Sequence, residues 1–221
     1  MFNVAIDGPA GAGKSTIAKA AAKALGFIYV DTGALYRTIA LNAVRNNIAD
    51  DSEKIISALD KIDVRLGFDS DGTQCVYLNG EDVSDYIRTP EISMAASKTS
   101  AIPQVREFLL DLQRDIAKEN NVIMDGRDIA TVVLPDADCK IFLFASPECR
   151  AERRYKELMK KGEKVSYEDV LDDVNQRDYQ DSNREIAPLK PTEESVMADT
   201  SELALEESID LIINTIKERM Q

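Results

Sequence analysis

The 221-residue chain contains no histidine. Without imidazole, it cannot form a Ser-His-Asp or Cys-His catalytic group, an H-E-x-x-H zinc site or a C-x-x-C-H haem attachment. Any chemistry carried out by this protein must therefore proceed without histidine as a base, a nucleophile or a metal ligand.

Cysteine and long hydrophobic runs are also scarce. Cys75, Cys139 and Cys149 are odd in number and too widely spaced for a C-x-x-C pair, so a disulfide scaffold or a structural zinc site is not expected. No apolar run reaches the ~18 residues that a membrane helix needs, and the amino terminus enters a strand and a glycine loop without a signal-like segment. We expect a cytoplasmic protein that does not bind membranes.

Positive charge is in deficit. Lys and Arg number 27 and Asp and Glu number 40, which gives a formal net charge of −13. A protein that follows a nucleic-acid duplex needs the opposite sign, so nucleic acid is not an expected partner. The composition is 44% hydrophobic with only 10 Gly and 7 Pro, which is typical of a globular protein. A local basic pocket for a phosphorylated small molecule remains compatible with the overall acidity.

Short apolar runs alternate with helical patterns along most of the chain. Strands are expected at residues 4–6, 27–30, 122–124, 141–145 and 196–197, and helices at residues 16–25, 34–44 and after Pro147. This alternation predicts an α/β fold in which helices cover both faces of a parallel sheet. The last helix has a predicted core-facing stripe formed by Leu205, Ile209, Ile212, Ile213 and Ile216.

Two segments depart from this rhythm. Residues 62–85 contain short strand patterns separated by the turn dipeptides Asp71-Gly72 and Asn79-Gly80, which predicts a small antiparallel insert. Residues 150–184 are highly charged and helical, with a helix-start signal at Ser166-x-x-Asp169. The arginines in this second segment favour a mobile lid over a merely solvated surface.

A phosphate-binding motif follows the first expected strand. Residues 8–15 read G-x-x-x-x-G-K-S and lead into a helix, which is the context that a P-loop requires. Its backbone amides would wrap an anionic phosphate, Lys14 would reach the β- and γ-phosphates, and the Ser15 hydroxyl would ligate Mg²⁺. The predicted ATP-binding residues are Gly8, Pro9, Ala10, Gly11, Ala12, Gly13, Lys14, Ser15 and Thr16.

A second magnesium-binding element is predicted at residues 122–125, where an apolar strand ends in Asp125. A strand that ends in a carboxylate has the form of a Walker B element. Asp7 and Asp128 also follow apolar runs, so they are alternatives to Asp125.

The remaining sequence favours a kinase among the P-loop proteins. The N-K-x-D motif for guanine is missing, and the D-x-x-G at residues 69–72 matches a switch protein only in its letters, because it falls in a turn of the insert. Arginines are abundant for so acidic a chain, and guanidinium groups bind phosphates in a bidentate manner, which suits two phosphorylated substrates. The arginines that suggest this role are Arg37, Arg88, Arg106, Arg127, Arg150, Arg153, Arg154, Arg177 and Arg184.

Four sequence blocks carry a family resemblance. They are G-P-A-G-A-G-K-S-T at residues 8–16, D-T-G-A-L-Y-R at 31–37, D-G-R-D-I-A-T-V-V at 125–133 and R-D-x-x-D-x-x-R at 177–184. In this order, and with the antiparallel insert between them, the chain resembles the bacterial cytidylate kinases, a family of P-loop nucleoside monophosphate kinases, from end to end. One departure is Thr32, where many relatives have serine; both residues carry a hydroxyl.

The resemblance implies phosphoryl transfer from ATP to CMP or dCMP, with Mg²⁺ as cofactor. It places Thr32, Arg37 and Arg127 near the acceptor phosphate, Ser97, Arg106 and Asp128 at the cytosine ring, and Arg177 and Asp181 at the pentose hydroxyls. Lys14, Arg127, Arg153 and Arg184 would be catalytic, with Arg154 also on the lid. It further implies one kinase domain with a core at about residues 1–31, 121–148 and 185–221, a monophosphate-binding lobe at 32–120 and a lid at 149–184.

This chemistry is compatible with the absence of histidine. The second phosphate pKa of a nucleoside monophosphate is near ~6, so its attacking oxygen is already anionic at neutral pH and needs no general base. Two alternatives remain open: a P-loop kinase for another small molecule, and a regulatory module that binds ATP and a protein without phosphoryl transfer. The absence of a long heptad pattern leads us to expect a monomer.

Overall fold

The computed structural model describes residues 1–69 and 72–221 and divides the chain into two compact units. The first unit comprises Met1 and Ile28–Asn120, and the second comprises Phe2–Phe27 and Asn121–Gln221. Over the described residues, no helix is both long and apolar enough to cross a membrane.

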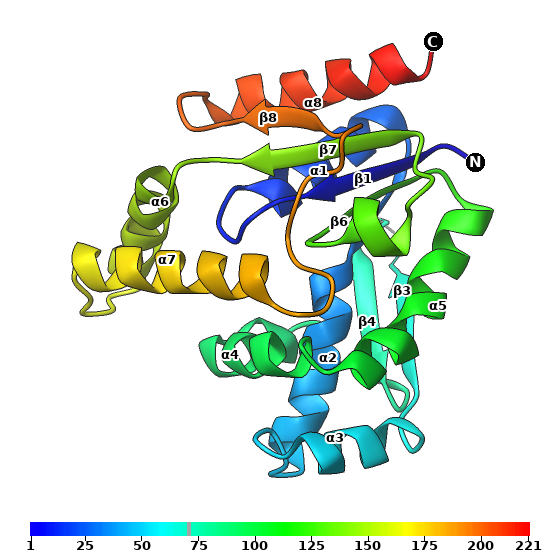
Figure 1. The fold of residues 1–221 in the computed structure, drawn as a ribbon, viewed down its shortest axis with the longest axis vertical. Coiled ribbons are helices and arrows are strands. Elements are labelled where there is room, and N and C mark those ends of the chain that lie inside the picture. Colours follow the sequence, from blue (N-terminus) through cyan, green and yellow to red (C-terminus); the bar gives the residue numbers. More distant parts are fainter. Residues whose placement is uncertain (70–71) are drawn as a thin grey trace. The chain divides into compact units, whose positions relative to one another are not determined.

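The second unit contains a parallel sheet with the strand order β6-β1-β7-β8 (Figure 1). Every residue of β6 is buried, and β1 is buried from Val4 onward, which explains why both read as apolar runs in the sequence. The strands are β1 (Asn3–Asp7), β6 (Val122–Gly126), β7 (Cys139–Phe144) and β8 (Val196–Asp199). The predicted α/β class with a parallel sheet is confirmed.

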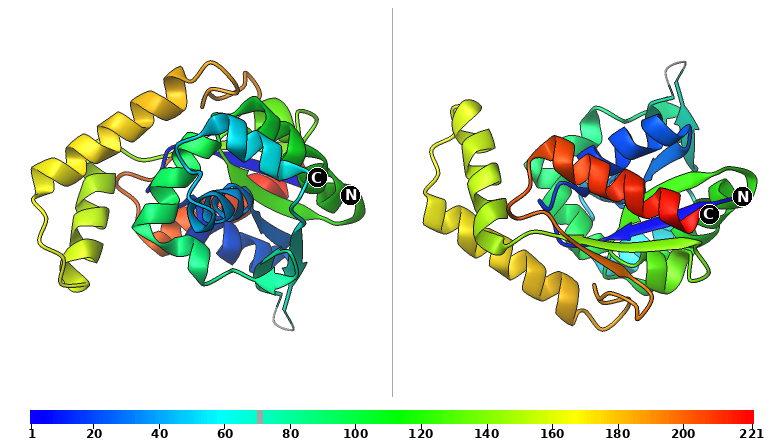
Figure 2. Two further views of the ribbon diagram at one scale, coloured as in Figure 1. Left: turned by 90° about the horizontal axis from the view of Figure 1, so that it is seen from below. Right: turned by 90° about the horizontal axis from the view of Figure 1, so that it is seen from above.

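The helices of the second unit come after these strands in the chain, and some pack beside them. Helix α8 lies beside α1 (Figures 1 and 2), and it buries Ile212 and Ile216 as its periodicity predicts. Leu205 is a correction to the predicted stripe: it starts α8 and is 47% exposed, because the first turn extends beyond the covered face. The helices are α1 (Lys14–Leu25), η2 (Ile129–Val133), α6 (Pro147–Lys160), α7 (Tyr167–Asn183) and α8 (Leu205–Arg219).

Helices α6 and α7 form a pair to one side of the parallel sheet (Figure 2). They share a small apolar cluster of Ala151, Leu158 and Val170, with mostly polar residues around it. The predicted helix start is confirmed, because Ser166 is the N-cap of α7 and its side chain accepts a hydrogen bond from the Asp169 amide. The predicted role of this pair as a lid stays a prediction.

The first unit packs helices around an antiparallel sheet. That sheet has the order β3-β4-β5, and β4 pairs with both neighbours in antiparallel fashion, which confirms the predicted insert. The elements are β2 (Ile28–Asp31), α2 (Thr32–Arg45), α3 (Ser52–Leu59), β3 (Val64–Phe68), β4 (Gln74–Leu78), β5 (Glu81–Asp82), a 3₁₀ turn (Tyr86–Arg88), α4 (Pro90–Thr99) and α5 (Pro103–Glu119).

Two turns were predicted in the insert, at Asn79-Gly80 and at Asp71-Gly72. Asn79 and Gly80 connect β4 to β5 with φ angles of 52° and 84°, as a two-residue hairpin turn requires. The Asp71-Gly72 turn, and with it the D-x-x-G match at 69–72, lies partly outside the described residues. The core of this unit is formed by α2, α4 and α5, with Leu35, Ile39 and Leu109 almost fully buried.

Asp7 ends β1 and connects the sheet to η2. Its two carboxylate oxygens accept hydrogen bonds from the Ile129 and Ala130 amides, both at 2.8 Å. Burial is the main cause that raises the pKa of Asp7 from 3.8 to about 6; the two amide bonds oppose this rise, and the nearby Asp128 adds to it. The folded chain therefore retains a proton at this carboxyl over a pH range in which the unfolded chain has released it.

This raised pKa gives the pH dependence of stability a definite sign. The free energy of unfolding of the wild-type chain, relative to an Asp7→Asn variant, should fall as the pH rises from about 4 to about 6, by roughly 3 kcal/mol in total. Above about pH 7 the difference should stay constant, because both states are then ionised. Urea unfolding of both proteins across this range measures it. A difference that is flat or rises between pH 4 and 6 would contradict the assignment.

Candidate active site

The phosphate loop connects β1 to α1. Gly8 has a φ of 153°, and a Cβ at this position would lie only 1.9 Å from the Leu143 backbone oxygen, so only glycine lets the loop pass β7 this closely. Helix α1 begins at Lys14 with Gly13 as its N-cap, two residues earlier than predicted, so Lys14 and Ser15 belong to its first turn. The amides of a first helical turn lack intrahelical partners and attract anions.

Lys14 is buried beneath this loop. Its side chain folds back so that Nζ donates a hydrogen bond to the Pro9 carbonyl oxygen at 2.8 Å. Burial, and secondly the positive charge of Arg127, lower the pKa of Lys14 to about 7, whereas Asp125, Asp7 and Asp181 act in the opposite direction. Two neighbouring cations in a buried setting attract an anionic ligand, as the predicted phosphate site requires.

Asp125 is the one of the three candidate carboxylates that meets the P-loop serine. Ser15 Oγ donates a hydrogen bond to Asp125 Oδ2 at 2.9 Å. The alternative Asp7 is occupied by the η2 amides, and the alternative Asp128 lies 3.6 Å from Nη2 of Arg184. A hydroxyl and a carboxylate side by side are the oxygen donors that Mg²⁺ prefers, so these residues fit that ion.

Magnesium ordinarily takes only one or two protein carboxylates and completes its shell with water and phosphate oxygens. Within residues 1–69 and 72–221, no group of three or more Cys, Asp or Glu side chains is arranged to hold a metal. Ser15 and Asp125 therefore form the candidate magnesium site.

The three predicted catalytic arginines of the second unit each contact a group of the chain itself. Arg127 Nε donates to Asp181 Oδ2 at 2.8 Å, and Arg153 donates to the Thr200 carbonyl oxygen at 2.9 Å. Arg184 donates to the Ala187 carbonyl oxygen at 2.5 Å. Phosphates that bind here would have to compete with these partners or add to them.

Helix α7 positions the other predicted residues of this unit. Asp181 is half-buried and forms an ion pair with Arg127. Arg177, one turn earlier on the same helix, is exposed. Arg184 is the C-cap of the same helix. The predicted pair of pentose-binding residues, Arg177 and Asp181, thus lies on one helix but in two different environments.

In the first unit, the 31–37 block builds the start of α2. Asp31 is the N-cap, and its carboxylate accepts hydrogen bonds from the Ala34 amide at 3.1 Å and from Arg37 Nη2 at 2.7 Å. A Cβ on Gly33 would lie 3.1 Å from both Arg37 Nη1 and Asp31 Oδ1, so glycine leaves room for this ion pair. Arg37 Nε is buried and makes no hydrogen bond, and Thr32 is buried in the first turn of α2.

The predicted base-reading residues of this unit come from two helices. Arg106, on α5, is buried; its guanidinium lies 5.4 Å from the centre of the Tyr36 ring and donates to the Ser100 carbonyl oxygen at 3.1 Å. Ser97, on α4, is half-buried, and its carbonyl oxygen accepts a hydrogen bond from Ser100 Oγ at 3.1 Å. The unit therefore brings Arg106 to the α2 segment that carries Arg37.

Sequence reasoning missed Arg150 and Asp178. Arg150 appeared only as one of many arginines, yet it is 2% exposed and forms a bidentate ion pair with Asp178. The signal that could have found Asp178 is the three-residue spacing of Asp178, Asp181 and Arg184, which places them along one side of a helix.

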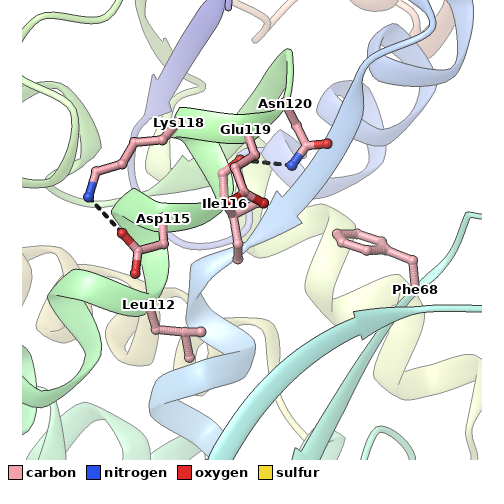
Figure 3. Close-up of a pocket in the computed structure, with 7 residues that line it drawn as sticks. All are labelled: Phe68, Leu112, Asp115, Ile116, Lys118, Glu119 and Asn120. Atoms are coloured by element: carbon pink, nitrogen blue, oxygen red, sulfur yellow. Dashed lines mark hydrogen bonds and ion pairs between the residues drawn. The ribbon is translucent and has the colours of Figure 1, made fainter.

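A cavity of about 430 Å³ in the first unit contains none of the predicted site residues (Figure 3). It lies between Phe68 and the last turns of α5, where Lys118 pairs with Asp115 and the Asn120 amide bonds to the Ile116 carbonyl oxygen. Its lining residues are Phe68, Leu112, Asp115, Ile116, Lys118, Glu119 and Asn120.

Comparison with known proteins shows which family the chain resembles. A sequence profile of the cytidylate kinase family matches residues 4–218. The cytidylate kinases of Caldanaerobacter subterraneus subsp. tengcongensis and Caldicellulosiruptor saccharolyticus are 52% and 50% identical to the chain, over 97% and 96% of its length and 94% of theirs. An uncharacterized protein from Eubacterium ventriosum is similar in fold alone, with a TM-score of 0.51 at 12% identity over 98% of each chain.

The profile match extends over almost the entire sequence, and it includes all four blocks that carry the resemblance. The relatives are about half identical over nearly the same length. The chain therefore belongs to the cytidylate kinase family.

Proposed function

We propose that this chain transfers the γ-phosphoryl group of ATP to CMP or dCMP, giving ADP and CDP or dCDP in pyrimidine nucleotide metabolism. The observation that supports this most strongly is the arrangement at the β1–α1 loop, where Lys14 is buried close to Arg127 and Ser15 is hydrogen-bonded to Asp125. Membership of the cytidylate kinase family supports the choice of acceptor.

The acceptor needs no general base from the protein. The terminal phosphate of CMP loses its second proton near pH ~6, so its oxygen is an anionic nucleophile at neutral pH. The protein then has to align this oxygen with the γ-phosphorus and to neutralise the charge around it. Lysine and arginine serve these purposes, and the chain has no histidine.

At the donor end, Gly8, Pro9, Ala10, Gly11, Ala12, Gly13 and Thr16 would line the phosphates, and Lys14 would bind the β- and γ-phosphates. Ser15 and Asp125 would hold Mg²⁺. When bound, this ion would offset part of the negative charge of the phosphates. Lys14 would exchange its bond to the Pro9 carbonyl oxygen for phosphate oxygens.

Acceptor-binding roles fall to residues in both units. In the first unit, the unpartnered Nε of Arg37 supports a role for this guanidinium at a phosphate, Thr32 is assigned to the same phosphate, and Ser97 and Arg106 are assigned to the base. In the second unit, Asp128 is assigned to the base, Arg177 and Asp181 to the pentose, and Arg127 to the acceptor phosphate. These assignments rest on the family resemblance.

Binding of the acceptor would rearrange the ion pairs of α7. Asp181 holds Arg127 in the structure, and Arg184 lies 3.6 Å from Asp128. If CMP phosphate binds Arg127 and cytosine binds Asp128, then Asp181 and Arg184 are released to contact pentose and phosphoryl oxygens. With Arg153, these residues would make α6 and α7 a lid that keeps water from the γ-phosphate.

The proposal also includes a cytoplasmic and monomeric enzyme. Cys75, Cys139 and Cys149 are all free thiols in the structure, which is compatible with a reducing compartment. The monomer is proposed from the sequence alone.

An acceptor panel tests the proposed reaction. ADP release should depend on ATP and Mg²⁺, and CMP and dCMP should stimulate it far more than UMP, AMP or GMP, because only cytosine would match the predicted base-reading residues. A reaction without acceptor is the control for hydrolysis. Preference for another acceptor would replace CMP by that substrate, and ATP binding without stimulation by any acceptor would favour the regulatory module.

Replacement of Lys14 by Ala should reduce the rate of transfer by at least about a hundredfold, because it removes the cation at the β- and γ-phosphates. Steady-state kinetics with saturating CMP measure the loss. Lys19→Ala is the matched control, since Lys19 is an exposed lysine on the same helix. Transfer at a near-normal rate in Lys14→Ala would refute the P-loop assignment.

The Asp128→Ala variant should raise the KM for CMP by roughly tenfold, the effect of one lost charged hydrogen bond. The KM for ATP should change much less, because Asp128 is assigned to the base of the acceptor. Asp136→Ala, at an exposed aspartate a short distance along the chain, is the control. Equal increases in both KM values would argue against base recognition by Asp128.

A further inference from the structure

Arg150, near the start of α6, is a buried cation whose hydrogen bonds all go to other parts of the second unit. Its Nε donates to the Ala145 carbonyl oxygen at 2.9 Å, in the segment that follows β7. Its Nη1 donates to the Ala10 carbonyl oxygen at 3.0 Å, within the phosphate loop. Nη1 and Nη2 also donate to the two carboxylate oxygens of Asp178 on α7, at 2.9 and 2.5 Å.

The aliphatic part of the same side chain lies beside the next residue of the loop. A Cβ built on Gly11 would lie 3.6 Å from Arg150 Cβ and 3.9 Å from Cγ, so this stem borders the space beside Gly11. Arg150 therefore holds Ala10 through a hydrogen bond and lines the space next to Gly11, the following loop residue. Its guanidinium links Asp178 of α7 to the Ala10 carbonyl of the phosphate loop.

Stability alone is a weak reason for such an arrangement. Burial of a guanidinium and a carboxylate costs desolvation energy that their attraction offsets only in part, so a buried ion pair of this kind contributes little net stability. The fork geometry of arginine, however, lets one group serve three acceptors in fixed directions, which lysine cannot do. The Arg150 guanidinium therefore serves to position a neighbouring segment, and that segment is the phosphate loop, whose amides would bind ATP.

We propose that Arg150 is a positioning residue for the donor site, and that the Asp178 carboxylate orients its guanidinium so that the loop is held ready for the triphosphate. The proposal rests on the ATP-binding role of the loop in the proposed function. Through the same contacts, the position of α7 and the shape of the phosphate loop depend on each other. ATP affinity should therefore respond to changes on α7, at a residue that is not itself placed in contact with nucleotide.

Isothermal titration of ATP and, separately, of CMP into four single variants and one double variant tests this. Asp178→Asn removes the charge that orients Arg150, Arg150→Met removes every polar contact, and Arg150→Lys keeps the charge but has a single nitrogen. Lys156→Met is the matched control, because Lys156 is on the same helix and its ion pair with Glu152 is exposed. Melting temperatures establish that each variant is folded at the temperature of titration.

The Kd for ATP should rise roughly tenfold in Asp178→Asn and Arg150→Lys and further in Arg150→Met, whereas the Kd for CMP should stay within about twofold. The double variant Arg150→Met with Asp178→Asn should be no worse than Arg150→Met alone, since both act through one contact. Lys156→Met should bind ATP as the wild type does.

A merely structural role would lower the melting temperature without this split between donor and acceptor. The proposal is overturned if ATP affinity in Arg150→Lys and Asp178→Asn stays within about twofold of the wild type, or if the affinities for ATP and CMP fall equally. Because ATP is titrated without acceptor, failure of CMP as a substrate in the acceptor panel would refute the proposed reaction and leave this test valid.

Discussion

The buried positive charge of Lys14 is the constraint on which the site depends. Burial and Arg127 lower the pKa of Lys14 to about 7, and nearby carboxylates oppose these effects and favour the ammonium. Asp7, Asp125 and Asp181 supply that negative charge, and each also accepts a hydrogen bond elsewhere. Asp7 accepts from the η2 amides, Asp125 from Ser15, and Asp181 from Arg127. The electrostatics of the phosphate site and the connections between β1, β6 and α7 therefore form one network.

Strand register determines which carboxylate reaches which partner. In the parallel pairing of β1 with β6, Ile6 lies opposite Asp125 and Asp7 lies opposite Gly126. Paired residues point to the same face of a sheet and successive residues alternate, so Asp7 and Asp125 project to opposite faces. Asp125 thus meets Ser15 at the start of α1, while Asp7 meets η2 on the other face. A shift of one residue would exchange these roles.

The parts of the site that could be predicted from the sequence are those that lie within one short segment. The phosphate loop is such a segment, because residues 8–15 contain the whole motif and its flanking strand and helix are visible as patterns. The sequence favoured Asp125 over Asp7 and Asp128 but could not settle the choice, since it depends on register between strands more than a hundred residues apart. The same holds for Arg150, whose partners Ala10 and Asp178 are distant in sequence. Leu205 shows the opposite error: helical periodicity predicted a buried residue, but the first turn of α8 extends beyond its cover.

The excess of acidic residues and the abundance of arginine have a common explanation. A reaction between two polyanions needs cations at the reacting groups and, because the acceptor is already ionised, no histidine base. A cation in a partly buried setting is costly unless a counter-charge lies beside it. In this chain Arg37, Arg127 and Arg150 are each paired with an aspartate, so the charge is balanced locally before any ligand binds. The carboxylates that make the whole chain acidic therefore include those that balance these arginines, and phosphates at the proposed site would have to compete with them or add to them.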